Sequence, residues 1–170
     1  YLTGAGVDAT NNHGIWAERS GALTLVARIG SQAPSTGAGV VFSTTYAPSL
    51  NAAGQTAFFA NLTGAGVDAS NNEGLWSEGG GALALVARSG SQAPGFGAGV
   101  NFNHLSTNVM LNSAGKVATV GSLTGAGIDA TNDKGIWSNR GGALDLVVRS
   151  DSAAAGGGVN FSSFPAYVLN

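Results

Sequence analysis

The chain has 170 residues, of which 44% are hydrophobic and only 9% are charged, against roughly 25% charged residues in an ordinary soluble domain. The formal net charge of −2 and the absence of a basic run exclude a typical nucleic-acid-binding surface, which needs clustered Lys and Arg. No apolar run reaches the roughly 18 residues of a membrane-spanning helix, and there is no cysteine for a disulfide or a thiolate metal site.

One stretch of sequence recurs three times and organises the chain. Residues 62–94 read LTGAGVDASNNEGLWSEGGGALALVARSGSQAP, residues 2–34 repeat them almost unchanged, and a looser copy starts at Leu123. The tryptophans of the three copies lie 60 and 61 residues apart, at Trp16, Trp76 and Trp137. Self-similarity at a fixed period is the mark of a tandem repeat. Each unit is too small to bury a core alone.

Within each unit, short apolar runs alternate with turn-forming clusters of Gly, Asn, Asp and Ser, which predicts strands joined by tight turns. In the best-covered copy we expect four strands, the fourth interrupted near Ser106. They are Gln55–Leu62, Gly74–Glu78, Ala82–Gly90 and Val100–Leu111. The sequence therefore predicts an all-β tandem repeat of four-stranded antiparallel units of about 60 residues each.

We divide the chain into unit 1 (1–51), unit 2 (52–112) and unit 3 (113–170), and favour β-propeller-like blades, with an open stacked β-sheet array as the alternative. No equivalent of residues 52–60 precedes Tyr1, so unit 1 lacks its first strand. We expect the chain, which opens on Tyr1 rather than Met, to be a mature product or part of something longer. Three blades are too few to close a ring, which usually needs 4–8. We expect another chain or further sequence to complete the unpaired edge.

The GAGVDATNN loop is the first candidate site, because Asp and Asn oxygens on a Gly-rich turn are the ligands that Ca²⁺ prefers. Each loop offers only one or two carboxylates, however, and we favour a turn in which these side chains cap their own backbone. No other cofactor is indicated. The weak calcium candidates are Asp8, Asp68, Asp129 and Asp133.

The tryptophan of each copy is the second candidate. Trp16, Trp76 and Trp137 could each stack on a sugar ring, as in carbohydrate-binding propellers, but we favour packing between blades, since an indole buries a large apolar area. The third candidate is an arginine at a repeated strand end, found at Arg28, Arg88 and Arg149. We expect it to pair with a repeated aspartate (Asp8, Asp68, Asp129) or with loop carbonyls rather than with a ligand.

The remaining candidates are weaker. His13 and His104 occupy non-equivalent positions of the repeat, and nothing in their spacing indicates a catalytic or zinc site. Asn61 and Asn160 begin N-x-[ST] sequons, which makes them candidates for glycosylation. No residue supports a catalytic assignment, so we do not expect an enzyme.

Residues 51–58 read N-A-A-G-Q-T-A-F. This segment resembles the repeat of bacterial proteins described by the pattern NxxGxxAF, which often carry one of several alternative C-terminal surface anchors. Residues 112–119 keep Asn112, Gly115 and Ala118 but replace the Phe by Thr119, and the third copy stops at Asn170. The GIW and LVAR segments are also similar to that family. The resemblance implies a secreted or surface-displayed bacterial protein and supplies no catalytic residues.

These observations lead to two hypotheses of function. The first is a structural extracellular or cell-surface protein whose copies join end to end by strand complementation into a fibre or surface layer, since the copies are near-identical, the surface has little charge and one strand is missing. The second is a carbohydrate-binding (lectin-like) propeller module or adhesin. The expected partners are copies of the chain itself or carbohydrate, without nucleic acid or a membrane span in this chain.

Overall fold

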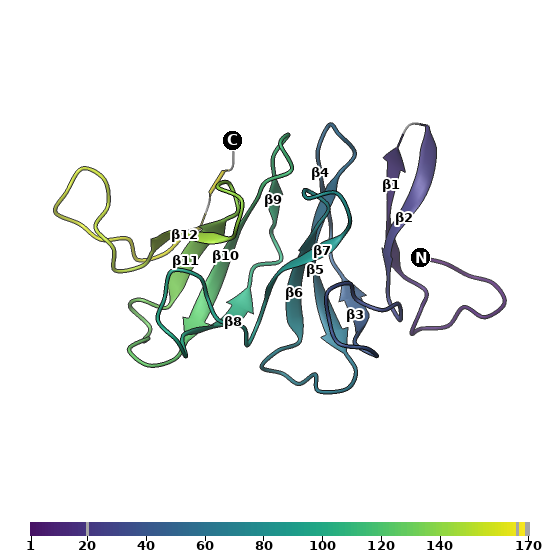
Figure 1. The fold of residues 1–170 in the computed structure, drawn as a ribbon, viewed down its shortest axis with the longest axis horizontal. Helices are drawn as coiled ribbons and strands as arrows, with labels where there is room; N and C mark the ends of the chain where they lie inside the picture. Colours follow the sequence, from purple (N-terminus) through teal and green to yellow (C-terminus); the bar gives the residue numbers. More distant parts are fainter. Residues whose placement is uncertain (20, 166, 169–170) are drawn as a thin grey trace.

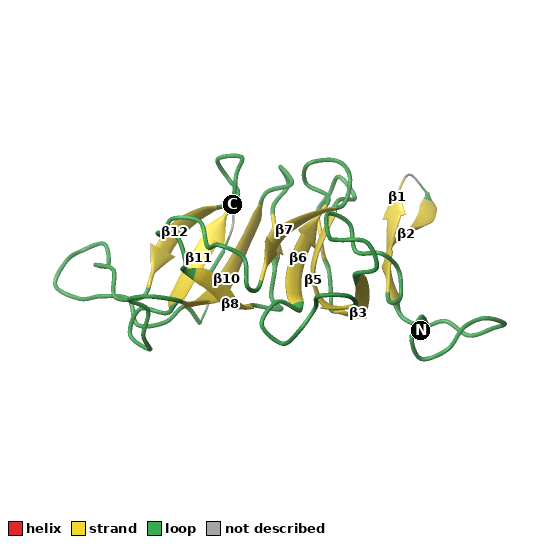
Figure 2. Cartoon of the chain, turned by 60° about the horizontal axis from the view of Figure 1, so that its bottom comes forward, coloured by secondary structure: helices red, strands yellow, loops and turns green. Residues whose placement is uncertain are grey.

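The computed structural model describes residues 1–19, 21–165 and 167–168, and these residues form twelve β-strands and no helix. The prediction of an all-β chain is confirmed. The strands build three open antiparallel sheets that follow one another along the long axis of the molecule (Figures 1 and 2). None of the described residues belongs to a helix long and apolar enough to cross a membrane.

Sheet 1 is a two-stranded hairpin at the N-terminal end of the stack. It pairs β1 (Gly14–Arg19) with β2 (Ala22–Arg28), and a register shift falls between Ile15 and Trp16. Among the described residues β1 has no other strand partner. One edge of this sheet is therefore open.

Sheet 2 lies in the middle of the stack and has strand order β3-β5-β6-β7, with β4 also paired to β5. Strands β5, β6 and β7 agree with the predicted ones to within two residues at each end. The predicted fourth strand, Val100–Leu111, forms two strands of the next sheet with the expected interruption between them, and β3 and β4 show the same break. The bounds are β3 (Val41–Thr45), β4 (Ser49–Leu50), β5 (Thr56–Thr63), β6 (Glu73–Ser77) and β7 (Ala84–Arg88).

Sheet 3 repeats this topology with order β8-β10-β11-β12 and with β9 paired to β10. After β12, the described residues of 159–165 and 167–168 belong to no named strand, and the pairing there is an isolated bridge between Ala153 and Asn160. The bounds are β8 (Asn101–Leu105), β9 (Met110–Leu111), β10 (Val117–Thr124), β11 (Lys134–Ser138) and β12 (Asp145–Arg149).

The sheets straddle the unit boundaries drawn from the sequence. We placed residues 100–111 as the last strand of unit 2, whereas β8 and β9 in that segment pair with β10 of unit 3. The same holds for β3 and β4, which pair with β5. Each complete sheet is thus a meander that begins one strand earlier than the predicted unit. The sequence repeat gives the length of the structural unit, but it does not show at which residue one sheet ends and the next begins.

Two apolar layers hold the three sheets together. The first lies between sheets 1 and 2 and includes Ile15, Phe42, Phe58 and Trp76. The second lies between sheets 2 and 3. Strand β5 supplies both layers, because successive side chains of a strand point to opposite faces: Phe58 enters the first layer and Phe59 the second. Sheet 2 is therefore apolar on both faces and buried on both.

The glycine two residues before each tryptophan has no side chain, and this leaves space for the indole ring. A Cβ on Gly74 would lie 2.4 Å from Cη2 of Trp76, and a Cβ on Gly135 would lie 2.6 Å from Cη2 of Trp137. Both tryptophans are fully buried. The glycine of the G-[IL]-W pattern is therefore needed because the tryptophan ring packs against the backbone of its own strand.

We predict that Gly74→Ala lowers the free energy of unfolding by about 1–3 kcal/mol, because the added methyl group must displace a buried ring. Chemical denaturation measures this change. Gly97→Ala is the matched control, since a Cβ there meets no atom within 4 Å and the backbone is not left-handed. Equal stability of the two variants would contradict this account of the pattern.

Candidate functional site

The GAGVD loops form turns that are closed by their own side chains. Asp68 Oδ1 accepts hydrogen bonds from the backbone N–H of Ser70 at 2.8 Å and from its hydroxyl at 2.6 Å, and Asn71 Oδ1 accepts one from the Asp68 N–H at 3.1 Å. The loops at Asp8 and Asp129 repeat these contacts. The hydroxyl donor first, and then the backbone N–H, lower the pKa of all three carboxyls below its ordinary value.

These carboxylates are not gathered into a metal site. No group of three or more His, Asp or Glu side chains within the described part of the chain is placed to hold a metal ion. Asp133, the remaining calcium candidate, pairs through Oδ2 with Lys134 Nζ at 2.6 Å. Calcium binding stays a prediction without a cluster of ligands to support it.

The repeated arginines fasten the loops to the strand ends. Arg88 donates from Nε to the Asn71 carbonyl at 2.6 Å and from a terminal nitrogen to Asn71 Oδ1 at 3.0 Å, and Arg28 makes the same pair of bonds to Asn11. The expected loop carbonyl is confirmed as a partner. Among the described residues no ion pair joins these arginines to the aspartates. The arginine charge still contributes to the lowered pKa of Asp8 and Asp68. Arg149 instead stacks on the Phe96 ring, 5.5 Å from its centroid.

The buried tryptophans connect each sheet to the loop that leaves the preceding sheet. Trp76 Nε1 donates to the Pro34 carbonyl at 3.0 Å, and Trp137 Nε1 donates to the Pro94 carbonyl at the same distance. Their rings have no exposed face for a sugar. Trp16 is the exception, because it is only partly buried. The predicted packing between sheets is present at two of the three positions.

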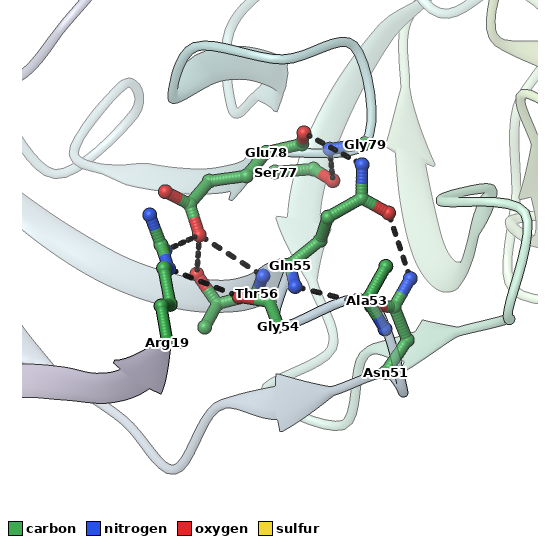
Figure 3. A network of polar contacts seen from close by, with 9 residues as sticks. All are labelled: Arg19, Asn51, Ala53, Gly54, Gln55, Thr56, Ser77, Glu78 and Gly79. Carbon is green, nitrogen blue, oxygen red and sulfur yellow. Dashed lines mark hydrogen bonds and ion pairs between the residues drawn. The ribbon is translucent and has the colours of Figure 1, made fainter. Parts of the chain in front are cut away.

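A buried carboxylate joins sheets 1 and 2 (Figure 3). Glu78, at the end of β6, accepts from the Thr56 N–H at 3.0 Å, from the Thr56 hydroxyl at 2.6 Å, and from a terminal nitrogen of Arg19 on β1. Arg19 also donates from Nε to the Gly54 carbonyl at 3.1 Å. Burial raises the pKa of Glu78, but these hydrogen bonds and the Arg19 charge outweigh it and hold the pKa below 4.5. The sequence analysis did not predict this ion pair, because neither Arg19 nor Glu78 belongs to a recognised motif.

Sheets 2 and 3 meet at the equivalent place without an ion pair. Gly79 takes the position of Arg19 and packs directly on Gly115, where a Cβ on Gly79 would lie 1.7 Å from the Gly115 carbonyl oxygen. Asn139 takes the position of Glu78 and accepts from the Val117 N–H at 2.6 Å. One joint is therefore closed by a long cation and an anion, and the other by the direct contact of two glycine backbones.

The two histidines occupy non-equivalent positions of the repeat, but each lies at a contact between neighbouring sheets. His13 Nδ1 is 2.9 Å from the Thr45 hydroxyl between sheets 1 and 2, and His104 Nδ1 is 2.9 Å from Glu73 Oε1 between sheets 2 and 3. Glu73 occupies the repeat position of His13 and also accepts from the Leu105 N–H at 2.8 Å. His13 thus contacts a hydroxyl and His104 a carboxylate, and the two imidazoles lie at different contacts between sheets.

The N-x-x-G segments are the turns that lead into β5 and β10. Asn51 Oδ1 accepts from the backbone N–H groups of residues 53 and 55 at 3.0 and 3.1 Å, and Gly54 has a φ of 75°. Ala57 and Phe58 are fully buried. Asn112 and Gly115 build the same turn before β10, and Asn170 lies outside the described residues.

The two sequon asparagines differ in accessibility. Asn61 lies within β5, paired with Glu73 on one side and Thr44 on the other, and is half-buried. Asn160 is exposed and donates from Nδ2 to Asp151 Oδ1 at 3.0 Å. A glycan on either residue stays a prediction.

We predict that Glu78→Gln lowers the free energy of unfolding at pH 7 by about 1–2 kcal/mol, because charged hydrogen bonds are stronger than neutral ones. The folded pKa of Glu78 is lowered, so its contribution to stability is complete above pH 4.5 and is lost as the pH falls through the folded pKa. The variant should flatten this part of the pH–stability curve in urea titrations. Asp145→Asn, an exposed carboxylate in β12, is the control. A Glu78→Gln curve parallel to the wild type would contradict the role of the ion pair.

Comparisons with known proteins place the chain in one family. No curated protein and no solved structure matches it. The model of a family described as being of unknown function, DUF7453, matches residues 1–170. Since that match covers the whole chain, the protein belongs to the DUF7453 family.

Proposed function

We propose that this is a structural repeat protein whose copies associate end to end, by strand complementation, into a fibre or a surface layer. The observation that carries the proposal is the open edge of β1. In sheet 2 the equivalent strand, β6, is paired with β5 on one side and β7 on the other, whereas β1 is paired only with β2 in the described residues. An open edge presents unpaired N–H and C=O groups that accept a strand from another chain.

The surroundings of this edge leave space for such a strand. A hollow of about 410 Å³ lies between β1 and the β3–β4 segment, lined by residues that include Ile15, Trp16, Tyr46 and Pro48. In sheet 2 the corresponding space beside β6 is filled by β5. A strand added from a second copy would fill this hollow and extend the sheet.

We further propose that the sheets are propeller-like blades. Sheets 2 and 3 are each antiparallel five-stranded meanders, and each packs face to face on its neighbour, as blades do. The three sheets of the described residues are fewer than the 4–8 blades of a closed ring. Copies joined end to end would continue the stack, either as an open array or as a closed ring.

The proposed location is extracellular or at the cell surface. It rests on the resemblance to NxxGxxAF repeat proteins and on the scarcity of charge, with 9% charged residues in the chain. Carbohydrate binding is the alternative function. It is favoured at one position only, Trp16, which is partly accessible beside the hollow at the β1 edge.

We predict that the purified protein forms concentration-dependent oligomers, and that negative-stain images show linear or ring-shaped particles longer than one chain. Sedimentation velocity over a wide range of concentrations measures the association. A species of constant monomeric mass at every concentration would contradict the proposal. Glycan binding that disappears in Trp16→Ala, with an unchanged melting curve, would favour the alternative.

A further inference from the structure

The two ends of the stack carry the two halves of an interface that the molecule already contains twice. The N face is the outer face of sheet 1, formed by Trp16, Leu23 and Leu25. The C face is the outer face of sheet 3, formed by Ala118, Val120, Ile136 and Val147. We propose that the N face of one copy packs on the C face of a second copy, in the register of the two internal joints. This inference rests on the proposed self-association and adds a face-to-face contact to the strand addition proposed at the β1 edge.

The N face repeats residues that are covered elsewhere in the molecule. Its equivalents on sheet 2 are Trp76, fully buried, and Leu83 and Leu85, which pack against the apolar layer between sheets 1 and 2. On sheet 1 the same positions are open: Leu23 is 72% exposed and Leu25 is 50% exposed. A face that the fold buries at one site is thus left uncovered at the other.

The C face repeats the opposite half of that interface. In sheet 2 its equivalents Phe59 and Leu75 are buried against sheet 3. In sheet 3 Ile136 is only half-buried and Val147 is 62% exposed. A mainly apolar hollow of about 410 Å³ opens over this face, rimmed by Tyr167. Apolar faces of this kind mark interaction sites on soluble proteins.

Two polar groups would set the register of the joint. Arg140 has the repeat position of Arg19, is exposed, and makes no salt bridge among the described residues. Glu18 has the repeat position of Glu78 and is also exposed. Stacking a second copy as sheet 2 stacks on sheet 1 would bring its Glu18 to Arg140, as Glu78 meets Arg19 within the chain. The two ends therefore carry opposite charges at the positions of the internal ion pair.

The tryptophan contact would recur in the same way. Trp76 and Trp137 donate to the carbonyls of Pro34 and Pro94, in the loops that leave the preceding sheets. The equivalent carbonyl after sheet 3 belongs to Ala155. Among the described residues, Trp16 is the tryptophan whose Nε1 has no such carbonyl partner. A contact between unlike ends is heterologous, so it builds an open filament or closes into a ring according to the rotation per copy.

A charge exchange tests the joint. Arg140→Glu places two carboxylates at the contact between identical copies, and Glu18→Arg places two guanidinium groups there. We expect each variant alone to associate at least about threefold more weakly than the wild type, as measured by sedimentation velocity. Mixed in equal amounts, the two variants should associate again with alternating copies, because every joint in the mixture then pairs Glu with Arg.

An apolar truncation provides the second arm. Trp16→Ala should weaken association by about 30-fold, the effect of a central interface residue, while its chemical denaturation midpoint at low protein concentration stays that of the wild type. Leu50→Ala removes an exposed leucine outside both faces and should leave association unchanged.

The outcomes separate the two proposals. A wild type that stays monomeric overturns self-association itself. A wild type that associates, but whose association is unaffected by Trp16→Ala and by both charge variants, overturns only the pairing of the N and C faces and leaves strand addition at β1 in place. Variants that weaken association alone but fail to recover when mixed overturn the assigned register.

Discussion

The burial of apolar side chains on both faces of a small sheet is the constraint on which the rest of the structure depends. Strand β5 alternates between two layers, with Phe58 in one and Phe59 in the other. A four-stranded sheet of this kind gains little by folding alone, because one face would always meet water. Stability has to come from the neighbouring sheet, as in other repeat proteins, where intrinsic and interface terms add along the array.

Close packing at the joints depends on residues that contribute little surface of their own. Glycine at position 74 lets the Trp76 ring lie against β6, and the indole N–H then reaches the loop of the preceding sheet at Pro34. The joint between sheets 2 and 3 uses Gly79 against Gly115, whereas the other joint uses Arg19 and Glu78. The two apolar layers are alike, whereas the polar contacts beside them differ. We infer that the apolar layers set the geometry of stacking.

Local features of this fold could be read from the sequence because local chemistry produces them. Turn-forming Gly and Asn, the apolar run of β5 and the break between β8 and β9 all follow from short-range preferences. The phase of the repeat could not be read, since the pairing of β8 with β10 rather than β7 is a long-range choice. The ion pair of Arg19 and Glu78 was invisible for the same reason: the residues lie in different units and meet only after the sheets stack.

The proposed self-association depends on the outer faces of sheets 1 and 3. Repeat proteins that act as isolated monomers close their arrays with terminal units whose outer faces are polar. Here β2 presents Leu23 and Leu25 outward, and β12 presents Val147 at the opposite end. A chain with 9% charged residues has little else on its surface to oppose association. Under the proposed self-association, the burial of apolar area that joins sheets within the chain would also join the outer face of sheet 3 to the outer face of sheet 1 of a second copy.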